Sequence, residues 1–600
     1  MSQPFRWTLL WIVGSMVGAV SALMMLSQGY DGGQFYPSNP DAVYHARRIL
    51  DALFTHQPVI QFDPKIHVPE GSWLTWPWGF DQLLTWITSA FGPYPNEAAA
   101  NRVLMNIPPA VMPIAVGIVV NIARQLKLPI LLAILLVLAF AALPTVYMQF
   151  GVGNIDHHFA ELTFTLGMIS AGLWFFREGD TSPAAGIVFG AVLGVAMSIH
   201  NGLFILQIPV ALALSVFWLR GTPLPDRRQV DAFAISLVVA TLLICLPSEP
   251  WRRGFFEFYT LSWFHSYIAA CVAGFAVILS RVQRTPRNIA LVVFAAALAL
   301  LPIVGTLPFA KDFVSGELEA IRNVSEVNSP YQLYKESGEA LSTRIISWFM
   351  WVSAPFALLN IWWLIRQRDR AIQYLALTNA LGLLLMQMQY RFCVFGAFSM
   401  LLTPVLATKI LLEARPQWRV KLLAGCAVVM AAGLYPTFAN WHFNWILGSA
   451  VPYANLLPGF PKLKELCEKR PGVVLSDLDM GHWVRYHSNC SVIADVFLLT
   501  PQHARKAVEN SKLLLLTPQQ LLDARKDVRY VFAYHPAQFG LDENGQESPN
   551  LDVLRLAMTP LERDLLGPED KIPHEFNKRW ESRTPAGHVF ARLYEIVPGP

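Results

Sequence analysis

Charged residues are scarce in this chain. Only 15% of its 600 residues are Asp, Glu, Lys or Arg, whereas soluble domains contain about 25%. This deficit excludes a disordered chain and a coiled coil, and it argues against an ordinary cytosolic enzyme. Cysteine is scarce as well, and six cysteines exclude a small scaffold held together by disulfides. The formal net charge of +4 is too small to indicate nucleic acid as a partner.

Hydrophobic residues, in contrast, make up 54% of the chain. They gather in runs of about 20 residues, the length that crosses a bilayer as a helix. The first run covers about 7–26, and a long polar stretch follows at about 27–102. Twelve further runs centre near 112, 138, 168, 192, 210, 238, 273, 298, 355, 380, 402 and 430. After about 440 the composition becomes that of a soluble protein.

This pattern predicts a polytopic α-helical membrane protein with two domains. Residues 1–440 are expected to form about thirteen transmembrane helices, with a large first outer loop at 27–102 and a mobile outer loop at 309–342. Residues 441–600 are expected to form a mixed α/β outer domain.

Basic residues recur in alternate loops between the apolar runs. Cytoplasmic loops are enriched in Lys and Arg, so this set of loops is expected to face the cytoplasm. With thirteen spans, the N-terminus is then cytoplasmic, and the first loop and the C-terminal domain lie outside. We therefore expect a multi-pass protein of the inner (cytoplasmic) membrane with a periplasmic domain. The basic residues are Arg124, Lys127, Arg177, Arg220, Arg227, Arg228, Arg281, Arg284, Arg287, Arg366, Arg368, Arg370, Arg415, Arg419 and Lys421.

The second predicted outer loop, GVGNIDHHFAEL, contains four ionisable residues within six positions: Asp156, His157, His158 and Glu161. An Asp-x-His pair can bind one divalent cation. Asp156 could instead be a helix N-cap, but that role would not explain His158 or Glu161 beside a hydrocarbon boundary. Ionisable groups there are costly and usually functional. The motif predicts a metal site.

Three other ionisable residues fall on the same predicted membrane face. Asp41 lies on an amphipathic stretch, which could also be an interfacial helix with a solvated face. Glu326 lies in the polar loop, and Arg391 follows the eleventh span, where an Arg can also snorkel to the interface. Carboxylates with one His suit Mn²⁺ or Mg²⁺. A divalent metal together with an Arg is suited to a diphosphate leaving group.

These segments resemble the catalytic subunit of oligosaccharyltransferase, a C-type membrane glycosyltransferase, in the single-subunit form of bacteria and archaea. NPDAVYHARRI resembles the first acidic motif and implies a role for Asp41. GNIDHHFAE resembles the second acidic motif and implies metal binding by Asp156 and His158. NVSE resembles the motif of the fifth outer loop and implies a role for Glu326, and YRF resembles the segment that carries the arginine Arg391. The resemblance covers essentially the whole chain and implies thirteen spans and a C-terminal outer domain.

The sequence departs from the family in the soluble domain. The family signature there is Trp-Trp-Asp-Tyr-Gly, and the corresponding stretch here is SDLDMGHW. Asp479 and Trp483 match, which implies contact with the acceptor, whereas Asp477 and Leu478 replace the two Trp and Met480 replaces the Tyr. The acceptor is therefore read differently or is of another kind. This segment could also be a strand and turn in the core of the domain.

The hypothesis that follows is metal-dependent, inverting transfer of a glycan from a polyprenyl-diphosphate carrier, by a single subunit, to an acceptor. Asp41, Asp156 and His158 are expected to hold Mn²⁺ or Mg²⁺. Asp41 and Glu326 are expected to orient and activate the acceptor, and Arg391 is expected to bind the donor.

His157 is expected to orient the metal ligands, and Glu161 is expected to contact a ligand or to be one itself. Cys467 and Cys490 could pair or remain two buried thiols.

Protein asparagine is the expected acceptor, and a lipid, a glycan or a protein site without the Asn-x-Ser/Thr sequon is the alternative. A transporter or flippase is a third reading, but it would place ionisable residues near mid-bilayer. A non-catalytic scaffold is a fourth, and it would not need the Asp-x-His motif.

Overall fold

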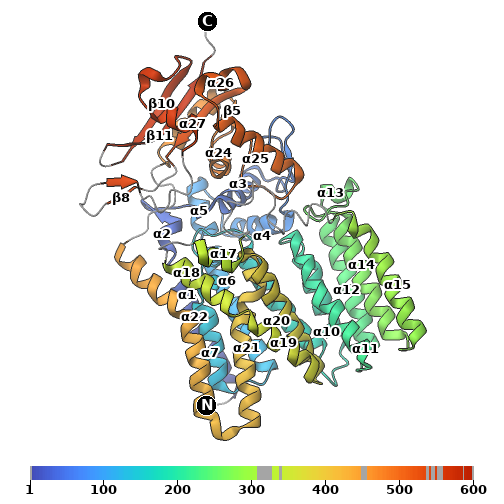
Figure 1. The fold of residues 1–600 in the computed structure, drawn as a ribbon. Coiled ribbons are helices and arrows are strands. Elements are labelled where there is room, and N and C mark those ends of the chain that lie inside the picture. The colour runs from blue at the N-terminus through green and yellow to red at the C-terminus, as the bar shows by residue number, and fades with distance from the viewer. Residues whose placement is uncertain are drawn as a thin grey trace. The chain divides into compact units, whose positions relative to one another are not determined.

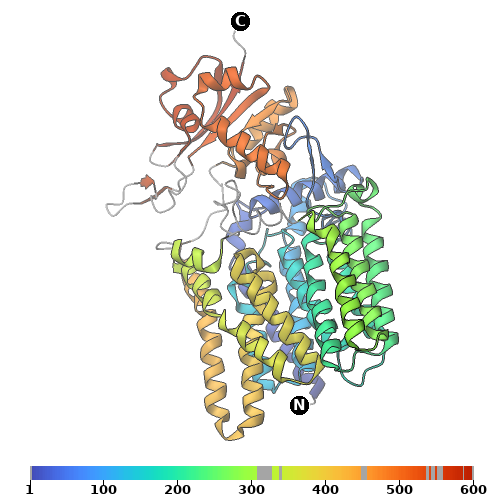
Figure 2. The same ribbon diagram turned by 45° about the vertical axis from the view of Figure 1, so that its right-hand side comes forward.

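The structure is a computed structural model (Figures 1 and 2). It describes residues 3–306, 328–336, 341–447, 456–535, 539–541, 547–549, 558–584 and 587–597. The chain forms two compact units. Unit 1 comprises Met1–Gly29, Thr75–Tyr94 and Asn101–Ser449, and unit 2 comprises Tyr30–Leu74, Pro95–Ala100 and Ala450–Pro600.

Unit 1 is built from helices, because its long apolar runs satisfy their backbone hydrogen bonds within each segment. Its first part holds α1 (Gln3–Leu23), α2 (Leu26–Gly29), α4 (Trp78–Ser89), α6 (Ile107–Gln125), α7 (Ile130–Ala142), α8 (Pro144–Tyr147), α9 (His158–Phe175), α10 (Pro183–Ala196), the 3₁₀ helix η1 (Asn201–Gln207), α11 (Ile208–Arg220), α12 (Arg227–Cys245) and α13 (Glu249–Arg252). Its second part holds α14 (Trp263–Arg281), α15 (Pro286–Val304), α17 (Pro330–Glu336), α18 (Leu341–Val352), α19 (Pro355–Arg366), α20 (Arg370–Met388), η3 (Tyr390–Phe392), α21 (Cys393–Ala414), η4 (Pro416–Trp418) and α22 (Arg419–Leu447). Helix α5 (Glu97–Leu104) begins in unit 2 and ends in unit 1.

Ten helical segments among the described residues are long and apolar enough to cross a membrane. The helices Ile130–Ala142 and Pro183–Ala196 are also apolar but shorter. The prediction of a multi-pass α-helical membrane protein is confirmed at this level.

Helix α10 packs closely along α12 (Figure 1). Gly186, Gly190 and Gly194 follow one another at four-residue spacing on α10. A Cβ atom on Gly190 would lie 2.4 Å from the carbonyl oxygen of Phe233, so only glycine permits this approach of the two backbones. Small residues at this spacing are typical of helix pairs that associate inside a bilayer.

Unit 2 combines the predicted C-terminal domain with most of the predicted first outer loop. The loop contributes β1 (Tyr30–Asp31), β2 (Gln34–Phe35), α3 (Pro40–Thr55), β3 (Phe62–Asp63) and β4 (Ser72–Trp73). The C-terminal part contributes α23 (Gly459–Lys469), β5 (Val473–Leu475), α24 (Leu478–His487), β6 (Ser491–Val492), α25 (Pro501–Leu514), α26 (Pro518–Ala524), β7 (Val528–Tyr534), β8 (Phe539–Leu541), β9 (Glu547–Pro549), α27 (Pro560–Leu566), η6 (Glu569–Lys571), β10 (Phe576–Arg583) and β11 (Val589–Ile596).

A five-stranded mixed sheet organises unit 2, with strand order β10-β11-β7-β5-β6. Strand β5 pairs in parallel with β6 and β7, whereas β7, β11 and β10 pair antiparallel. Helix α24 connects β5 to β6, as parallel strands require a crossover connection. The predicted mixed α/β character of the C-terminal part is seen here.

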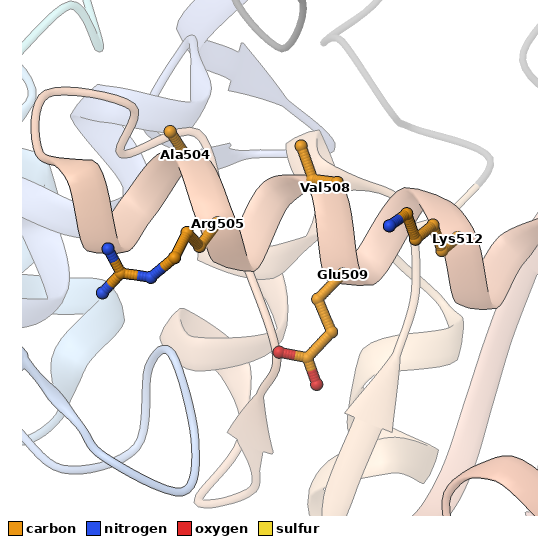
Figure 3. A pocket seen from close by; sticks show the side chains of 5 residues that line it. All are labelled: Ala504, Arg505, Val508, Glu509 and Lys512. Carbon is orange, nitrogen blue, oxygen red and sulfur yellow. The ribbon is translucent and has the colours of Figure 1, made fainter.

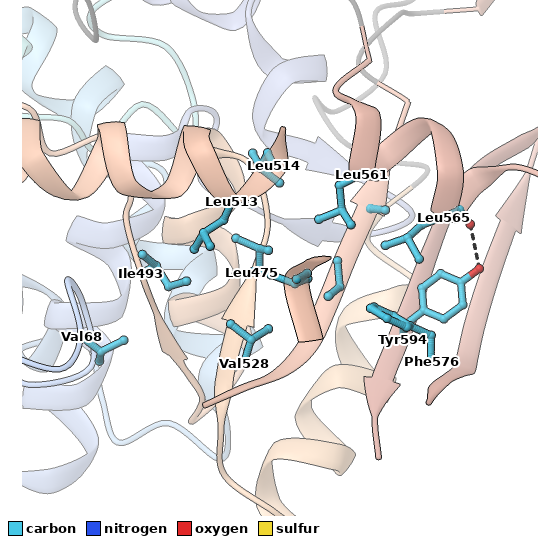
Figure 4. Close-up of a cluster of buried hydrophobic side chains, with 13 residues drawn as sticks. Val68, Leu475, Ile493, Leu513, Leu514, Val528, Leu561, Leu565, Phe576 and Tyr594 are labelled. Atoms are coloured by element: carbon cyan, nitrogen blue, oxygen red, sulfur yellow. Dashed lines mark hydrogen bonds between the residues drawn. The ribbon is translucent and has the colours of Figure 1, made fainter. Parts of the chain in front are cut away.

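The core of unit 2 includes a side chain from the first loop. Val68 belongs to the buried cluster that also contains Leu475 and Ile493 (Figure 4). The backbone amide of Val68 donates a hydrogen bond to the carbonyl of Val492 at 3.3 Å, and Val492 returns one to Lys65. The first loop is therefore not a free loop, because part of it completes the packing of the C-terminal domain.

A buried ion pair adds to this attachment. Arg485 on α24 donates from Nε to Asp63 Oδ2 at 2.9 Å, and the Tyr44 hydroxyl donates to the same oxygen at 2.8 Å. Asp63 is fully buried, so removing either donor would leave a poorly compensated charge. Cys467 and Cys490 form a disulfide that joins α23 to the chain before β6, which resolves the choice between a pair and two thiols.

Candidate metal and donor site

The Asp-x-His motif lies where an irregular segment enters α9. Gly153 adopts a φ of +83°, and its amide donates to the carbonyl of Met105 at 2.9 Å. Helix α9 then begins at His158, with His157 at the N-cap position and no side-chain cap. Asp156 is therefore not the N-cap of this helix, and the alternative explanation for that residue is wrong.

The two predicted metal ligands of this motif lie close together. Asp156 Oδ2 and His158 Nε2 are 3.5 Å apart, and both side chains are about nine-tenths buried or more. The other oxygen of Asp156, Oδ1, lies 2.7 Å from His157 Nδ1 and also accepts from the backbone amide of His157 at 2.7 Å. One carboxylate oxygen is thus held by His157, and the second faces His158.

Glu161, one turn along α9, lies between two histidines. Its Oε2 lies 2.7 Å from His158 Nδ1, and its Oε1 lies 2.7 Å from His200 Nδ1. Glu161 thus contacts His158, one of the expected metal ligands, and its role beside a metal stays a prediction. His200 was not found from the sequence, although it is a lone ionisable residue in the short turn between two apolar runs on the predicted outer face.

This donor set fits a divalent cation. Cations with bonds of about 2.0 to 2.2 Å to oxygen and nitrogen place neighbouring ligands roughly 3 Å apart, close to the separation of Asp156 Oδ2 and His158 Nε2. A carboxylate that accepts from the far nitrogen of a ligand histidine, as Glu161 does, is the usual support of a metal-bound imidazole. His157, His158 and Glu161 also offer ligand atoms that all lie within 4.8 Å of one another.

Arg391 lies in η3, directly after α20. The amide of its neighbour Tyr390 donates to the carbonyl of Asn328 at 2.9 Å. Glu326 itself lies outside the described residues. Asn328, the first described residue after Glu326, is therefore hydrogen-bonded to Tyr390, the neighbour of Arg391.

Asp41 belongs to unit 2, in the first turn of α3. Helix α3 starts there because Asn39 caps it, accepting from the amide of Ala42 at 2.8 Å, and because Pro40 suits the first helical position. The Asp41 side chain is about one-third exposed. His482 lies against this turn, with Nδ1 3.0 Å from the Pro40 carbonyl and 4.0 Å from Asp41 Oδ1.

The segment that replaces the family's Trp-Trp-Asp signature forms the start of α24. Asp477 is the N-cap, and its second oxygen accepts from the Tyr534 hydroxyl at 2.6 Å. Burial, and then the nearby Asp477 carboxyl, raise the pKa of Asp479 to about 7. Trp483 has no exposed surface and stacks on Phe460 with ring centres 6.0 Å apart. Its expected contact with an acceptor stays a prediction. In this structure the ring packs α24 against α23 in the interior of unit 2.

A shallow surface pocket lies elsewhere on unit 2, on α25 (Figure 3). It is lined by Ala504, Arg505, Val508, Glu509 and Lys512, which all come from one helix. No residue of the predicted site is among them, so this pocket is separate from the candidate site.

The fold resembles that of one class of membrane glycosyltransferases. It resembles the archaeal oligosaccharyltransferase AglB from Archaeoglobus fulgidus, solved with an inhibitory peptide and a dolichol-phosphate. The TM-score is 0.76 at 15% identity, over 97% of this chain and 80% of that one. The same enzyme in complex with Zn and sulfate gives a TM-score of 0.68 at 16% identity, over 96% and 79%. The mycobacterial arabinofuranosyltransferase AftD gives 0.51 at 13% identity, over 100% of this chain and 42% of that one.

Within that class, the particular fold is the one seen in AglB, and the resemblance to the catalytic subunit of oligosaccharyltransferase is confirmed at the level of the fold. No protein-family model matches the sequence. No curated protein sequence matches it either.

Proposed function

We propose that this chain transfers a glycan from a polyprenyl-diphosphate carrier to an acceptor, and that the transfer depends on a divalent metal ion, Mn²⁺ or Mg²⁺. The observation that carries this proposal is the convergence of Asp156 Oδ2 and His158 Nε2, 3.5 Å apart and buried, in a chain with the AglB fold. The complex of AglB with Zn and sulfate supports a divalent site in proteins of this fold.

The proposed ligands are Asp156 and His158, joined by Asp41. When bound, the cation would neutralise the charge that develops on the departing diphosphate. His157 and Glu161 hold the side chains of Asp156 and His158 in place through the contacts at 2.7 Å. Arg391 would bind the diphosphate oxygens through its guanidinium group.

The reaction needs no covalent enzyme intermediate. The acceptor atom would attack the anomeric carbon from the face opposite the diphosphate, so that the new bond forms as the bond between carbon and phosphate oxygen breaks. The proton of the acceptor would pass to Asp41 or Glu326. The diphosphate leaves on the lipid, and the configuration of the sugar is inverted.

The acceptor is proposed to be a protein asparagine, because AglB is also known in complex with a peptide. One observation favours a different acceptor. Asp477 and Leu478 stand where the family has two Trp, and Asp477 already accepts bonds from Met480 and Tyr534 within unit 2. A lipid, a glycan or a protein site without the sequon is therefore the second candidate.

We further propose thirteen spans, a cytoplasmic N-terminus and an outer unit 2, acting as a single subunit. Among the described residues, ten helical segments are long and apolar enough to cross a membrane, and Ile130–Ala142, Pro183–Ala196 and α9 are three more apolar helices. The Cys467–Cys490 disulfide of unit 2 suits an oxidising compartment such as the periplasm.

The test is transfer from extracted lipid-linked glycans to peptides with and without Asn-x-Ser/Thr, analysed by mass spectrometry. Glycan on the sequon peptide alone supports the asparagine acceptor. Transfer to other peptides, lipids or glycans supports the second candidate. Absence of any transfer from lipid-linked donors, in the presence of Mn²⁺ and Mg²⁺, contradicts the transferase proposal.

A further inference from the structure

His200 lies in the turn between α10, which ends at Ala196, and η1, which begins at Asn201. Its backbone is extended, with φ −146° and ψ 128°. The imidazole contacts Glu161 on α9. The His200 side chain is 13% exposed and the Glu161 side chain 5%, so the pair is largely shielded from water.

The first contact of His200 connects it, through Glu161, to the proposed metal ligand His158. His200 Nδ1 lies 2.7 Å from Glu161 Oε1, while Glu161 Oε2 lies 2.7 Å from His158 Nδ1. An ionised carboxylate can only accept hydrogen bonds, so each of these Nδ1 atoms carries the proton. A neutral imidazole with its proton on Nδ1 has its lone pair on Nε2. His158 therefore presents a lone pair from Nε2, the atom that faces Asp156.

The second contact of His200 connects it, through His157, to the other proposed ligand, Asp156. The rings of His200 and His157 are stacked, with centres 4.5 Å apart and an angle of 14° between their planes. His157 in turn lies 2.7 Å from Asp156 Oδ1. His200 thus touches both residues that hold the ligands, one through a hydrogen bond and the other through a ring face.

We propose that His200 is a positioning residue of the candidate metal site, which acts through Glu161 and His157 to hold His158 Nε2 and Asp156 Oδ2 towards the same point. The inference rests on the proposed function, because it takes Asp156 and His158 as ligands of a divalent cation. Without the His200 N–H, one oxygen of a buried carboxylate would lose its donor, and Glu161 could turn away from His158.

Three variants test this role through binding of Mn²⁺ alone to the purified full chain, measured by titration calorimetry. His200→Phe keeps a flat ring against His157 but removes the donor, and we expect Mn²⁺ affinity to fall by roughly 10- to 100-fold. His200→Asn places an amide nitrogen where Nδ1 stood, and we expect affinity within about threefold of wild type. Gln373→Leu is the control for a general loss of packing, because Gln373 is a buried polar residue of unit 1 that donates to the carbonyls of Leu364 and Gln367.

Wild-type affinity in His200→Phe would overturn the inference. So would an equal loss in His200→Phe, His200→Asn and Gln373→Leu, since that result would indicate a general loss of packing. Rescue by His200→Asn is the result that a merely structural role would not produce.

A second measurement is independent of the metal and of the transferase proposal. In metal-free protein labelled with ¹⁵N in the histidine rings, the resonances of His158, assigned by their loss in His158→Gln, should show the proton on Nδ1. His200→Phe should convert them to a mixture of tautomers, and an unchanged tautomer would overturn the inference. A wild-type protein that holds this tautomer but transfers no glycan would contradict the proposed function and leave the positioning role supported.

Discussion

The amide of Tyr390 donates a hydrogen bond to the carbonyl of Asn328 at 2.9 Å. This bond joins residues that are far apart in the sequence, one beside Arg391 and the other two positions after Glu326. The next residue is also bonded, because the Ser329 amide donates to Gln332 Oε1 at 2.9 Å at the start of α17. Asn328 is therefore hydrogen-bonded to the neighbour of the arginine that is proposed to bind the donor.

Glu326→Gln should lower the transfer rate on the order of 100-fold, the scale of one general base, while Mn²⁺ affinity stays unchanged. The amide keeps the shape of the side chain but cannot take up a proton. Rates are measured with lipid-linked donor, and Glu413→Gln, an exposed residue on α21 paired with Lys409, is the control. A wild-type rate in Glu326→Gln would place this residue outside the reaction.

Asp156→Ala should abolish both Mn²⁺ binding and transfer, and EDTA should abolish transfer by the wild type. The variant removes one oxygen that faces His158 and one that is held by His157. Asp231→Ala is the control, because Asp231 pairs with Arg281 at an exposed position, where an ion pair contributes little. Full activity of Asp156→Ala, or of the wild type in EDTA, would refute the metal assignment.

Gly190→Leu should destabilise unit 1. Its side chain would meet the Phe233 carbonyl, which a Cβ already approaches to 2.4 Å, so that α10 and α12 would have to separate. Overpacking of this kind costs about 1 to 3 kcal/mol or more, and a lower midpoint of thermal unfolding in detergent would show it. Gly274→Leu on α14 is the matched control, since a Cβ there has no neighbour within 4 Å. Equal midpoints for the two variants would contradict the close packing.

Cys467→Ser should destabilise unit 2 by about 3 kcal/mol, because the disulfide closes a loop with a sequence separation of 23. Non-reducing peptide mapping should find the two cysteines in one linked peptide pair, and limited proteolysis should cut the variant faster in unit 2. The control is Cys271→Ser, which changes a free cysteine in unit 1. Two separate, alkylated cysteine peptides from the wild type would contradict the bond.

The stability of unit 2 should fall as the pH falls from about 6.5 towards 3. Burial lowers the pKa of His503 to about 3, whereas its unfolded value is about 6.5. Between these values the unfolded chain binds a proton that the folded chain does not, so acid favours unfolding by on the order of 4 kcal/mol. Nε2 of His503 forms a hydrogen bond with the Ser72 hydroxyl at 2.8 Å. A glutamine side chain can keep that bond.

His503→Gln should therefore flatten this pH dependence, measured by urea unfolding at a series of pH values. His574→Gln, at a residue that is 81% exposed, should leave the wild-type slope. An unchanged slope in His503→Gln would show that this histidine titrates alike in both states.

The sequence predicts the multi-pass helical character of the chain, because apolar runs of about 20 residues form helices that can cross a bilayer. It also predicts the Asp156–His158 pair from the Asp-x-His motif, and the irregular backbone before α9 brings Asp156 Oδ2 and His158 Nε2 to 3.5 Å. It does not reveal His200, which meets Glu161 only when α9 and α10 fold together. Nor does it reveal that Val68 enters the core of the C-terminal domain, since an apolar residue in a long loop has no periodic pattern to mark its burial.

The position of Val68 has a consequence for how the protein is made. Residues Tyr30–Leu74 of unit 2 leave the ribosome early, whereas its C-terminal part begins only at Ala450. At about 5 to 20 residues per second, the first loop waits tens of seconds, with its apolar side chains uncovered, until the strands that it packs against have been synthesised. A chaperone that shields this segment during translation would therefore raise the yield of folded protein, and deletion of the C-terminal strands would leave the segment as a target for proteases.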